Sequence, residues 1–175
     1  MATIRDNFAV EITNFVNKTQ GKVAAVYKKS VMDLFSSVVY STPVLTGRAR
    51  ANWMVSISEP IRATRENKSK TGAMVVNEIR SVLNFVKANS QAGYPAMFLS
   101  NSLPYISHLE YGWYEPDPVR GTWMVPYGGK GYEIRSSGGF SKQAPQGMVR
   151  MNVERWPDMV LNHTISVESG GSWSV

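Results

Sequence analysis

The first forty residues carry the longest hydrophobic pattern in the chain. Apolar side chains recur every three or four positions from residue 5 to residue 39, which is the spacing of one face of an α-helix. The stripe consists of Phe8, Ile12, Phe15, Val16, Val23, Val26, Tyr27, Val31, Leu34, Phe35 and Val38. A continuous helix of this extent would be about 50 Å long, more than a domain of this size can cover with its own core. We therefore expect part of the stripe to contact another subunit. The alternative is two shorter helices, broken at Thr19-Gln20-Gly21 and folded back on one core.

The segment after this helix predicts a small sheet. Pro43 ends the helix because proline lacks an amide hydrogen and restricts the residue before it. Residues 52–58 alternate, with Trp53, Val55 and Ile57 on one face, which is typical of a half-buried strand. Residues 94–100 predict a second strand.

Three further helices are expected. Helical spacing returns over residues 73–88, and Pro104 and Gly112 suit the first turn and the exit of a short helix. Residues 145–165 predict a last helix, which Pro157 should kink or restart. The pattern as a whole predicts one α+β domain over residues 1–168, with a long N-terminal helix and further helices packed on a small, mainly antiparallel sheet.

Residues 113–142 differ from the rest because they are rich in glycine, proline and aromatic side chains. They predict an inserted arm or hairpin, with extended segments near 123–127 and 132–135. Amphipathic aromatics are enriched at protein interfaces, so we expect protein contacts here; stacking on nucleic-acid bases is the alternative. Together with the short helix before it, this region carries eight aromatics between residues 105 and 140: Tyr105, Tyr111, Trp113, Tyr114, Trp123, Tyr127, Tyr132 and Phe140. Residues 169–175 predict a flexible tail.

Composition narrows the function classes. The chain of 175 residues has no cysteine, so it offers neither disulfides nor thiolate chemistry. Nineteen Lys and Arg against 13 Asp and Glu give a net charge of +6, but the basic residues are scattered and the longest basic-biased stretch is 62–70. A solvated surface is favoured over a nucleic-acid footprint, with non-specific DNA contact left open. Neither a signal peptide nor a membrane span is expected.

No constellation predicts catalysis. The glycine-rich segment 128–131 lacks the Ser or Thr and the following helix of a phosphate-binding loop. His108 and Glu110 diverge by about 200° on the short helix, and His163 is remote from both. We therefore assign no catalytic, cofactor-binding or metal-binding residue and expect no enzyme.

Three anchors in the chain form an ordered set. They are Thr42-Pro43-x-x-Thr46-Gly47-Arg48 followed by Trp53, then Asn101-x-x-Pro104-Tyr105-x-x-x-Leu109-Glu110-Tyr111-Gly112, then Ala144-Pro145-x-Gly147-Met148-Val149. In order and approximate spacing, this set resembles the tail-completion (head–tail joining) neck proteins of long-tailed bacteriophages. The resemblance implies a virion structural protein, assembled in the bacterial cytoplasm as a ring of six copies. The ring would surround the DNA channel and contact the head connector and the tail terminator, and genomic DNA would pass through its lumen without specific binding.

The resemblance also suggests residues for subunit or partner contacts. They are Thr46, Gly47, Arg48, Arg50, Trp53, Pro104, Tyr105, Glu110, Tyr111, Trp113, Trp123, Tyr127, Tyr132, Pro145 and Met148. Gly47 permits a tight turn, and Arg48 or Arg50 could form charge-assisted bonds across a subunit seam. Glu110 lies unfavourably near the C-terminal end of its helix, so we expect a cationic partner, Arg48 or Arg50. The alternative function is a basic DNA-binding accessory protein that uses the 62–70 loop and the aromatic arm.

Overall fold

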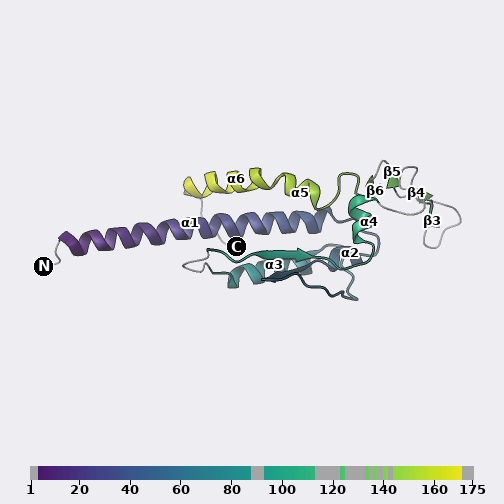
Figure 1. The fold of residues 1–175 in the computed structure, drawn as a ribbon, viewed down its shortest axis with the longest axis horizontal. Coiled ribbons are helices and arrows are strands. Elements are labelled where there is room, and N and C mark those ends of the chain that lie inside the picture. Colours follow the sequence, from purple (N-terminus) through teal and green to yellow (C-terminus); the bar gives the residue numbers. More distant parts are fainter. Residues whose placement is uncertain are drawn as a thin grey trace.

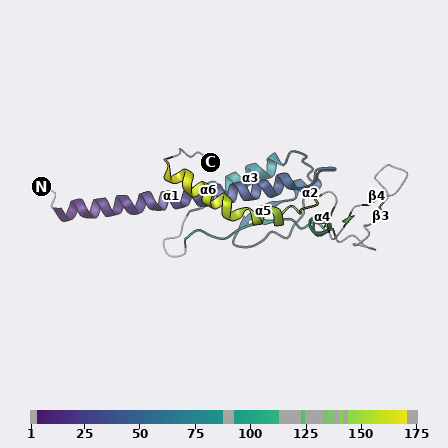
Figure 2. The same ribbon diagram turned by 90° about the horizontal axis from the view of Figure 1, so that it is seen from above.

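One long helix organises the molecule, and two layers of other elements lie along its C-terminal half (Figure 1). The computed structural model describes residues 4–87, 93–112, 123–124, 133–134, 136–137, 140–141 and 144–170. Helix α1 runs over Ile4–Ser41 without a break, and its 38 residues correspond to about 57 Å. The predicted continuous helix is thus confirmed, and the alternative of a break at residues 19–21 is wrong. In both views the N-terminal part of α1 extends beyond every other element (Figures 1 and 2).

The end of α1 is fixed by hydrogen bonds as well as by Pro43. The Thr42 hydroxyl donates to the carbonyl of Val38 at 2.8 Å, and the Thr42 amide donates to the carbonyl of Val39. Thr42 is fully buried. The helix therefore ends inside the core, where its last turn is held in place.

Two layers cover opposite sides of α1. Helices α5 (Arg150–Glu154) and α6 (Trp156–Glu168) lie along one side, and α3 (Ala73–Phe85) with a small sheet lies along the other (Figure 1). Seen from above, α6 lies over α1 (Figure 2). The core forms where these layers meet; its most buried apolar residues are Val39, Val75, Ile79, Leu83 and Met148.

The sheet has two antiparallel strands, β1 (Met54–Ile57) and β2 (Met97–Ser100), so the α+β class is confirmed. Their register pairs Met54 with Ser100 and Ile57 with Met97. The predicted alternation along β1 is wrong. Met54 and Val55 are both buried, whereas Ile57 is exposed. Burial follows position along the strand, because β1 begins in the core and runs out past it.

The shorter elements complete the chain. Helix α2 covers Arg48–Ala51, and α4 covers Ile106–Tyr111 and ends at Gly112 in the left-handed conformation, as predicted. In the arm, β3 (Trp123–Met124) pairs antiparallel with β4 (Glu133–Ile134), which agrees with the predicted hairpin. A second antiparallel pair, β5 (Ser136–Ser137) and β6 (Phe140–Ser141), was not predicted. The rest of the arm and residues 171–175 lie outside the described residues.

The last helical region begins later than predicted and restarts at its proline. Residues 145–149 form turns, because Gly147 has a positive φ of 78° that interrupts a helix. Pro157 lies in the first turn of α6, where its missing amide hydrogen costs no helical hydrogen bond. Within the described ranges, no helix is both long and apolar enough to cross a membrane.

Candidate assembly site

The three sequence anchors are joined by hydrogen bonds around the C-terminal end of α1. Asn101 of the second anchor donates to the carbonyl of Ala49 at 2.9 Å, and Glu110 of the same anchor binds the third. Asn152, which follows the third anchor, donates to the Ser41 hydroxyl at 3.1 Å. Segments far apart in sequence thus form one joint at the base of the long helix.

The side chain of Arg50 links the end of α1 to the segment that precedes α3. Its guanidinium donates to the carbonyls of Tyr40 and Thr42, both at 2.8 Å, and to the carbonyl of Lys70 at 2.6 Å. These carbonyls lie at the end of α1 and before α3, so one side chain links two layers. Burial lowers the pKa of Arg50, but an arginine remains charged at any pH at which the protein is folded.

Gly47 and Gly72 allow the backbone segments of this joint to approach closely. Gly47 has a φ of 85°, and a Cβ there would lie 2.6 Å from the carbonyl carbon of Ser69. Gly72 has a φ of 76°, and its Cβ would meet Val39 at 2.8 Å. Only glycine satisfies both the dihedral angle and the space at these positions.

Trp53 lies in the core and adds a hydrogen bond at the C-terminal end of α1. Its indole Nε1 donates to the Thr42 hydroxyl oxygen at 2.7 Å, and that hydroxyl in turn donates to Val38. Only 5% of Trp53 is exposed. The tryptophan of the first anchor therefore stabilises the protomer itself.

The Glu110 carboxylate joins the second anchor to the third. One oxygen accepts the backbone N–H of Met148 at 2.5 Å and of Val149 at 3.0 Å. The other accepts the backbone N–H and the Nε of Arg150, each at 3.1 Å. Arg150 also donates to the Glu110 carbonyl and lies 4.9 Å from the ring centre of Tyr111. We call this arrangement the Glu110 clasp.

The electrostatics of the clasp favour the ionised carboxylate. Burial by itself raises the pKa of Glu110. The hydrogen bonds from the backbone N–H groups of residues 149, 150 and 148 and from the Arg150 guanidinium outweigh burial, and they hold the pKa below its ordinary value. Gly147 leaves room for this carboxylate, since a Cβ at Gly147 would lie 2.6 Å from its Oε1.

The predicted pairing of Glu110 with Arg48 or Arg50 is therefore wrong. Arg50 is occupied by three carbonyls, and Arg48 forms a surface ion pair with Glu66 at 3.1 Å. The expected cationic partner exists, but it is Arg150, forty residues further along the chain. Only the fold brings Arg150 to Glu110, because nothing in the local spacing links them.

The residues predicted for subunit or partner contacts differ in how exposed they are. Thr46, Pro104, Tyr105 and Pro145 are exposed, and Arg48, Arg50 and Tyr111 are half-buried. Gly47, Trp53, Glu110 and Met148 are buried inside the protomer, so the expectation that these four contact a neighbour is wrong. Their conformational and packing roles lie within the protomer, as described above. Trp113, Tyr127 and Tyr132 lie outside the described residues, as does the side chain of Trp123.

A second group of polar contacts occupies the basic 62–70 loop. Arg65 forms a bidentate pair with Glu78, at 2.6 and 2.8 Å, and the backbone N–H and carbonyl of Arg65 both bind the side chain of buried Asn52. Sequence reasoning missed Asn52, which is fully buried. The loop is thereby fixed to the fold, while Arg62, Lys68 and Lys70 remain exposed.

The longest exposed run in the described part of the chain lies on the N-terminal part of α1 and carries several large apolar side chains. Residues 10–22, which we call the α1 projection, are all exposed, and Val23 after them is exposed as well. The large apolar side chains in this stretch are Val10, Ile12, Phe15, Val16 and Val23. Phe15 exposes 69% of its surface. This is the part of the predicted stripe that a single protomer cannot cover.

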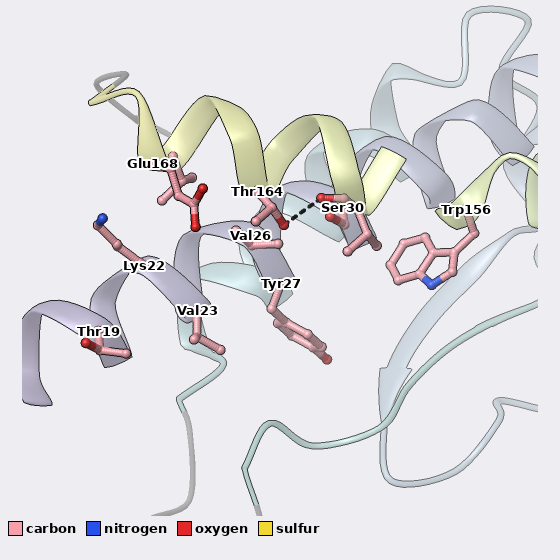
Figure 3. A pocket seen from close by; sticks show the side chains of 11 residues that line it. Thr19, Lys22, Val23, Val26, Tyr27, Ser30, Trp156, Thr164 and Glu168 are labelled. Carbon is pink, nitrogen blue, oxygen red and sulfur yellow. Dashed lines mark hydrogen bonds between the residues drawn. The ribbon is translucent and has the colours of Figure 1, made fainter. Parts of the chain in front are cut away.

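An apolar groove marks the point where α6 stops covering α1. It has a volume of about 400 Å³ and lies between the two helices (Figure 3). Val23, Val26 and Tyr27 line it from α1, and Trp156, Val160 and Val167 line it from α6. Lys22 and Glu168 lie at the end where α6 finishes (Figure 3). The exposed apolar stripe of the α1 projection is therefore continuous with the apolar surface of α1 that α6 covers.

The described residues contain no group of three or more His, Asp or Glu side chains that could hold a metal ion. His163 contacts Asp33, with Nε2 and Oδ2 2.8 Å apart, in the α1–α6 layer, and His108 lies on α4 beside Ser107. The arrangement is one of structural bonds around a projecting apolar helix. Comparison with known protein families, curated proteins and solved structures finds no match to this chain.

Proposed function

We propose that the protein is a structural component of the neck of a long-tailed bacteriophage. In this proposal its copies assemble into a ring around the DNA channel, complete the tail or join it to the head, and catalyse no reaction. The observation that carries the proposal is the α1 projection, an exposed apolar helix that its own protomer leaves uncovered. Uncovered apolar surface of this kind is typical of sites where proteins associate.

The joint at the base of α1 supports the same role. Arg50, Trp53 and the Glu110 clasp fix the direction of the helix relative to the core. A rigidly held projection can meet a neighbour in a defined orientation, which a closed ring requires. The three anchors that resemble neck proteins coincide with this joint, so the resemblance and the geometry point to the same residues.

The proposal is tested by locating the protein in particles. An epitope-tagged copy should label the head–tail junction in electron micrographs of purified phage, and mass spectrometry should detect the protein in the same particles. Particles made without the protein should accumulate as unjoined heads and tails. Absence of the protein from purified, infectious particles would rule the proposal out.

Non-specific DNA binding is the second candidate, because Arg62, Lys68 and Lys70 are exposed on one loop. Arg65 of the same loop is paired with Glu78, which reduces the charge available to phosphates. A DNA-binding protein should lose affinity steeply as salt rises, and replacement of Lys68 and Lys70 by Glu should remove the binding. Salt-insensitive or undetectable binding would exclude this candidate.

A further inference from the structure

The apolar groove between α1 and α6 ends next to the point where the described chain stops. Glu168, the last residue of α6, lines this end of the groove together with Lys22 of α1 (Figure 3). The chain then leaves the helix through Gly170, whose φ of 83° is the left-handed conformation that ends many helices. The groove volume of about 400 Å³ lies in the range of sites that hold a small ligand, so an indole ring has room in it.

The segment that follows Gly170 has a composition that suits this groove. Gly171-Ser172-Trp173-Ser174-Val175 contains no charged side chain, and its two serines alternate with apolar residues. Alternate side chains of an extended segment point to the same side, so Trp173 and Val175 share one side and the serines share the other. An apolar groove can accept the first side, while the serine hydroxyls stay in water.

The same segment is long enough to reach the groove from the end of its own helix. Thr164, which lines the groove, is six residues before Gly170, which corresponds to about 9 Å along the helix axis. Trp173 follows Gly170 by three residues, which span about 10 Å when they are extended. A chain that turns back at Gly170 can therefore place the indole beside Thr164, opposite the valines that line the groove from α1.

We infer that Trp173 docks in the α1–α6 groove of its own chain and closes the groove to other apolar ligands. The inference goes beyond the proposed function and does not rest on it. An indole buries more apolar surface than most side chains, so it is a strong anchor for such a contact. A short tether gives Trp173 an effective concentration on the order of millimolar at the groove, so the tail of another copy competes only in very concentrated protein. The docked tail is an autoinhibitory contact, because any ligand that uses the groove must first displace it.

Cross-linking of the full chain tests where the tail lies. The chain has no cysteine, so engineered thiols report only their own positions. A short bismaleimide should join Ser172→Cys to Val23→Cys at least about tenfold faster than it joins Ser172→Cys to Gly21→Cys. Gly21 is the matched control, because it is exposed like Val23 but lies about 200° away around α1, and a Cβ there meets nothing within 4 Å. Mass spectrometry of the linked peptides measures both rates, and equal rates would overturn the docking.

A second variant tests whether the indole is the group that docks. Trp173→Ser should slow the cross-link between Ser172→Cys and Val23→Cys to the rate of the Gly21→Cys pair, because serine buries little apolar surface. Ser174→Ala is the control and should leave the rate unchanged, since its side chain stays in water. An unchanged rate in Trp173→Ser would show that the tail lies near the groove without using its tryptophan, and the inference would be wrong.

Isotope labelling distinguishes docking within one chain from exchange of tails between copies. Unlabelled and isotope-labelled copies of the double variant Val23→Cys, Ser172→Cys are mixed in equal amounts before cross-linking. Docking within one chain should give linked peptides that are both unlabelled or both labelled. Mixed pairs as frequent as uniform pairs would show that the tail docks on a neighbouring copy, which would overturn the inference.

Discussion

At the scale of single residues, Glu110 is the most informative side chain. It is buried, its two oxygens accept from three successive backbone N–H groups and from Arg150, and it joins segments 38 to 40 residues apart. Sequence reasoning recognised that its position near the end of α4 required a positive partner. It could not identify Arg150, since a carboxylate in a folded chain can be reached from any segment.

Replacing Glu110 by Gln should lower the free energy of unfolding by about 2–3 kcal/mol. The neutral amide oxygen accepts weaker hydrogen bonds than the carboxylate does. The amide NH2 group, which replaces the second oxygen, faces N–H groups from which it cannot accept. Urea unfolding monitored by circular dichroism measures the loss. Glu59→Gln is the control, because Glu59 is exposed and the change should stay within about 0.5 kcal/mol. Equal stability of the two variants would contradict the role of the clasp.

The same carboxylate predicts how stability depends on pH. Because the pKa of Glu110 is lower in the folded than in the unfolded protein, its contribution is present above the unfolded pKa of about 4.3 and is lost as pH falls through the folded pKa. The wild type should therefore lose more unfolding free energy than Glu110→Gln between about pH 5 and pH 3. Parallel urea midpoints for the two proteins across this range would contradict the lowered pKa.

Gly147 and Gly93 provide a matched pair for testing close approach. Both have a positive φ, 78° and 71°, but a Cβ at Gly147 would collide with Glu110 while one at Gly93 would meet nothing within 4 Å. Gly93→Ala should cost about 1 kcal/mol through backbone strain alone. Gly147→Ala should cost at least about 2 kcal/mol, because the clasp must shift as well. Equal losses of stability would show that the clasp tolerates the extra atom.

At the scale of elements, helices were easier to predict than strands. The stripe in α1 repeats over ten turns, so tertiary contacts need not override it, and the restart at Pro157 follows from the missing amide hydrogen alone. The faces of β1 were predicted incorrectly because a four-residue strand has little periodicity. Whether Met54 or Ile57 is buried depends on where the strand enters the core.

Helix α1 makes a prediction of its own at Gly21. The helix passes through this glycine unbroken, and a Cβ there would meet nothing within 4 Å. Gly21→Ala should raise the free energy of unfolding by up to about 1 kcal/mol, because alanine has the higher helix propensity. Urea unfolding of the monomeric protein measures the change. A decrease in stability would mean that the helix bends at Gly21 in solution.

At the scale of the whole molecule, the sequence predicted that one part of the apolar stripe on α1 is buried in the core and another part is uncovered. It predicted the contacts at the joint less well. Counting residues was enough to show that a helix of this length exceeds the core. The location of the division could not be predicted, because it depends on α6 ending at Glu168, beside Lys22 of α1. The outer face of α6 was also missed. Leu161 on that face is 57% exposed, and periodicity alone does not say which face a second layer covers.

Removing residues 1–22 should separate folding from assembly. The α1 projection is exposed throughout, so the shortened protein should keep its unfolding free energy within about 1 kcal/mol of the full chain when both are measured as monomers. It should also lose the ability to form rings or to enter particles, because the apolar stripe that associates has been removed. Urea unfolding and mass photometry measure the two properties in the same samples. Unfolding of the shortened protein would mean that the projection stabilises the protomer directly, and normal assembly without it would place the subunit contacts elsewhere.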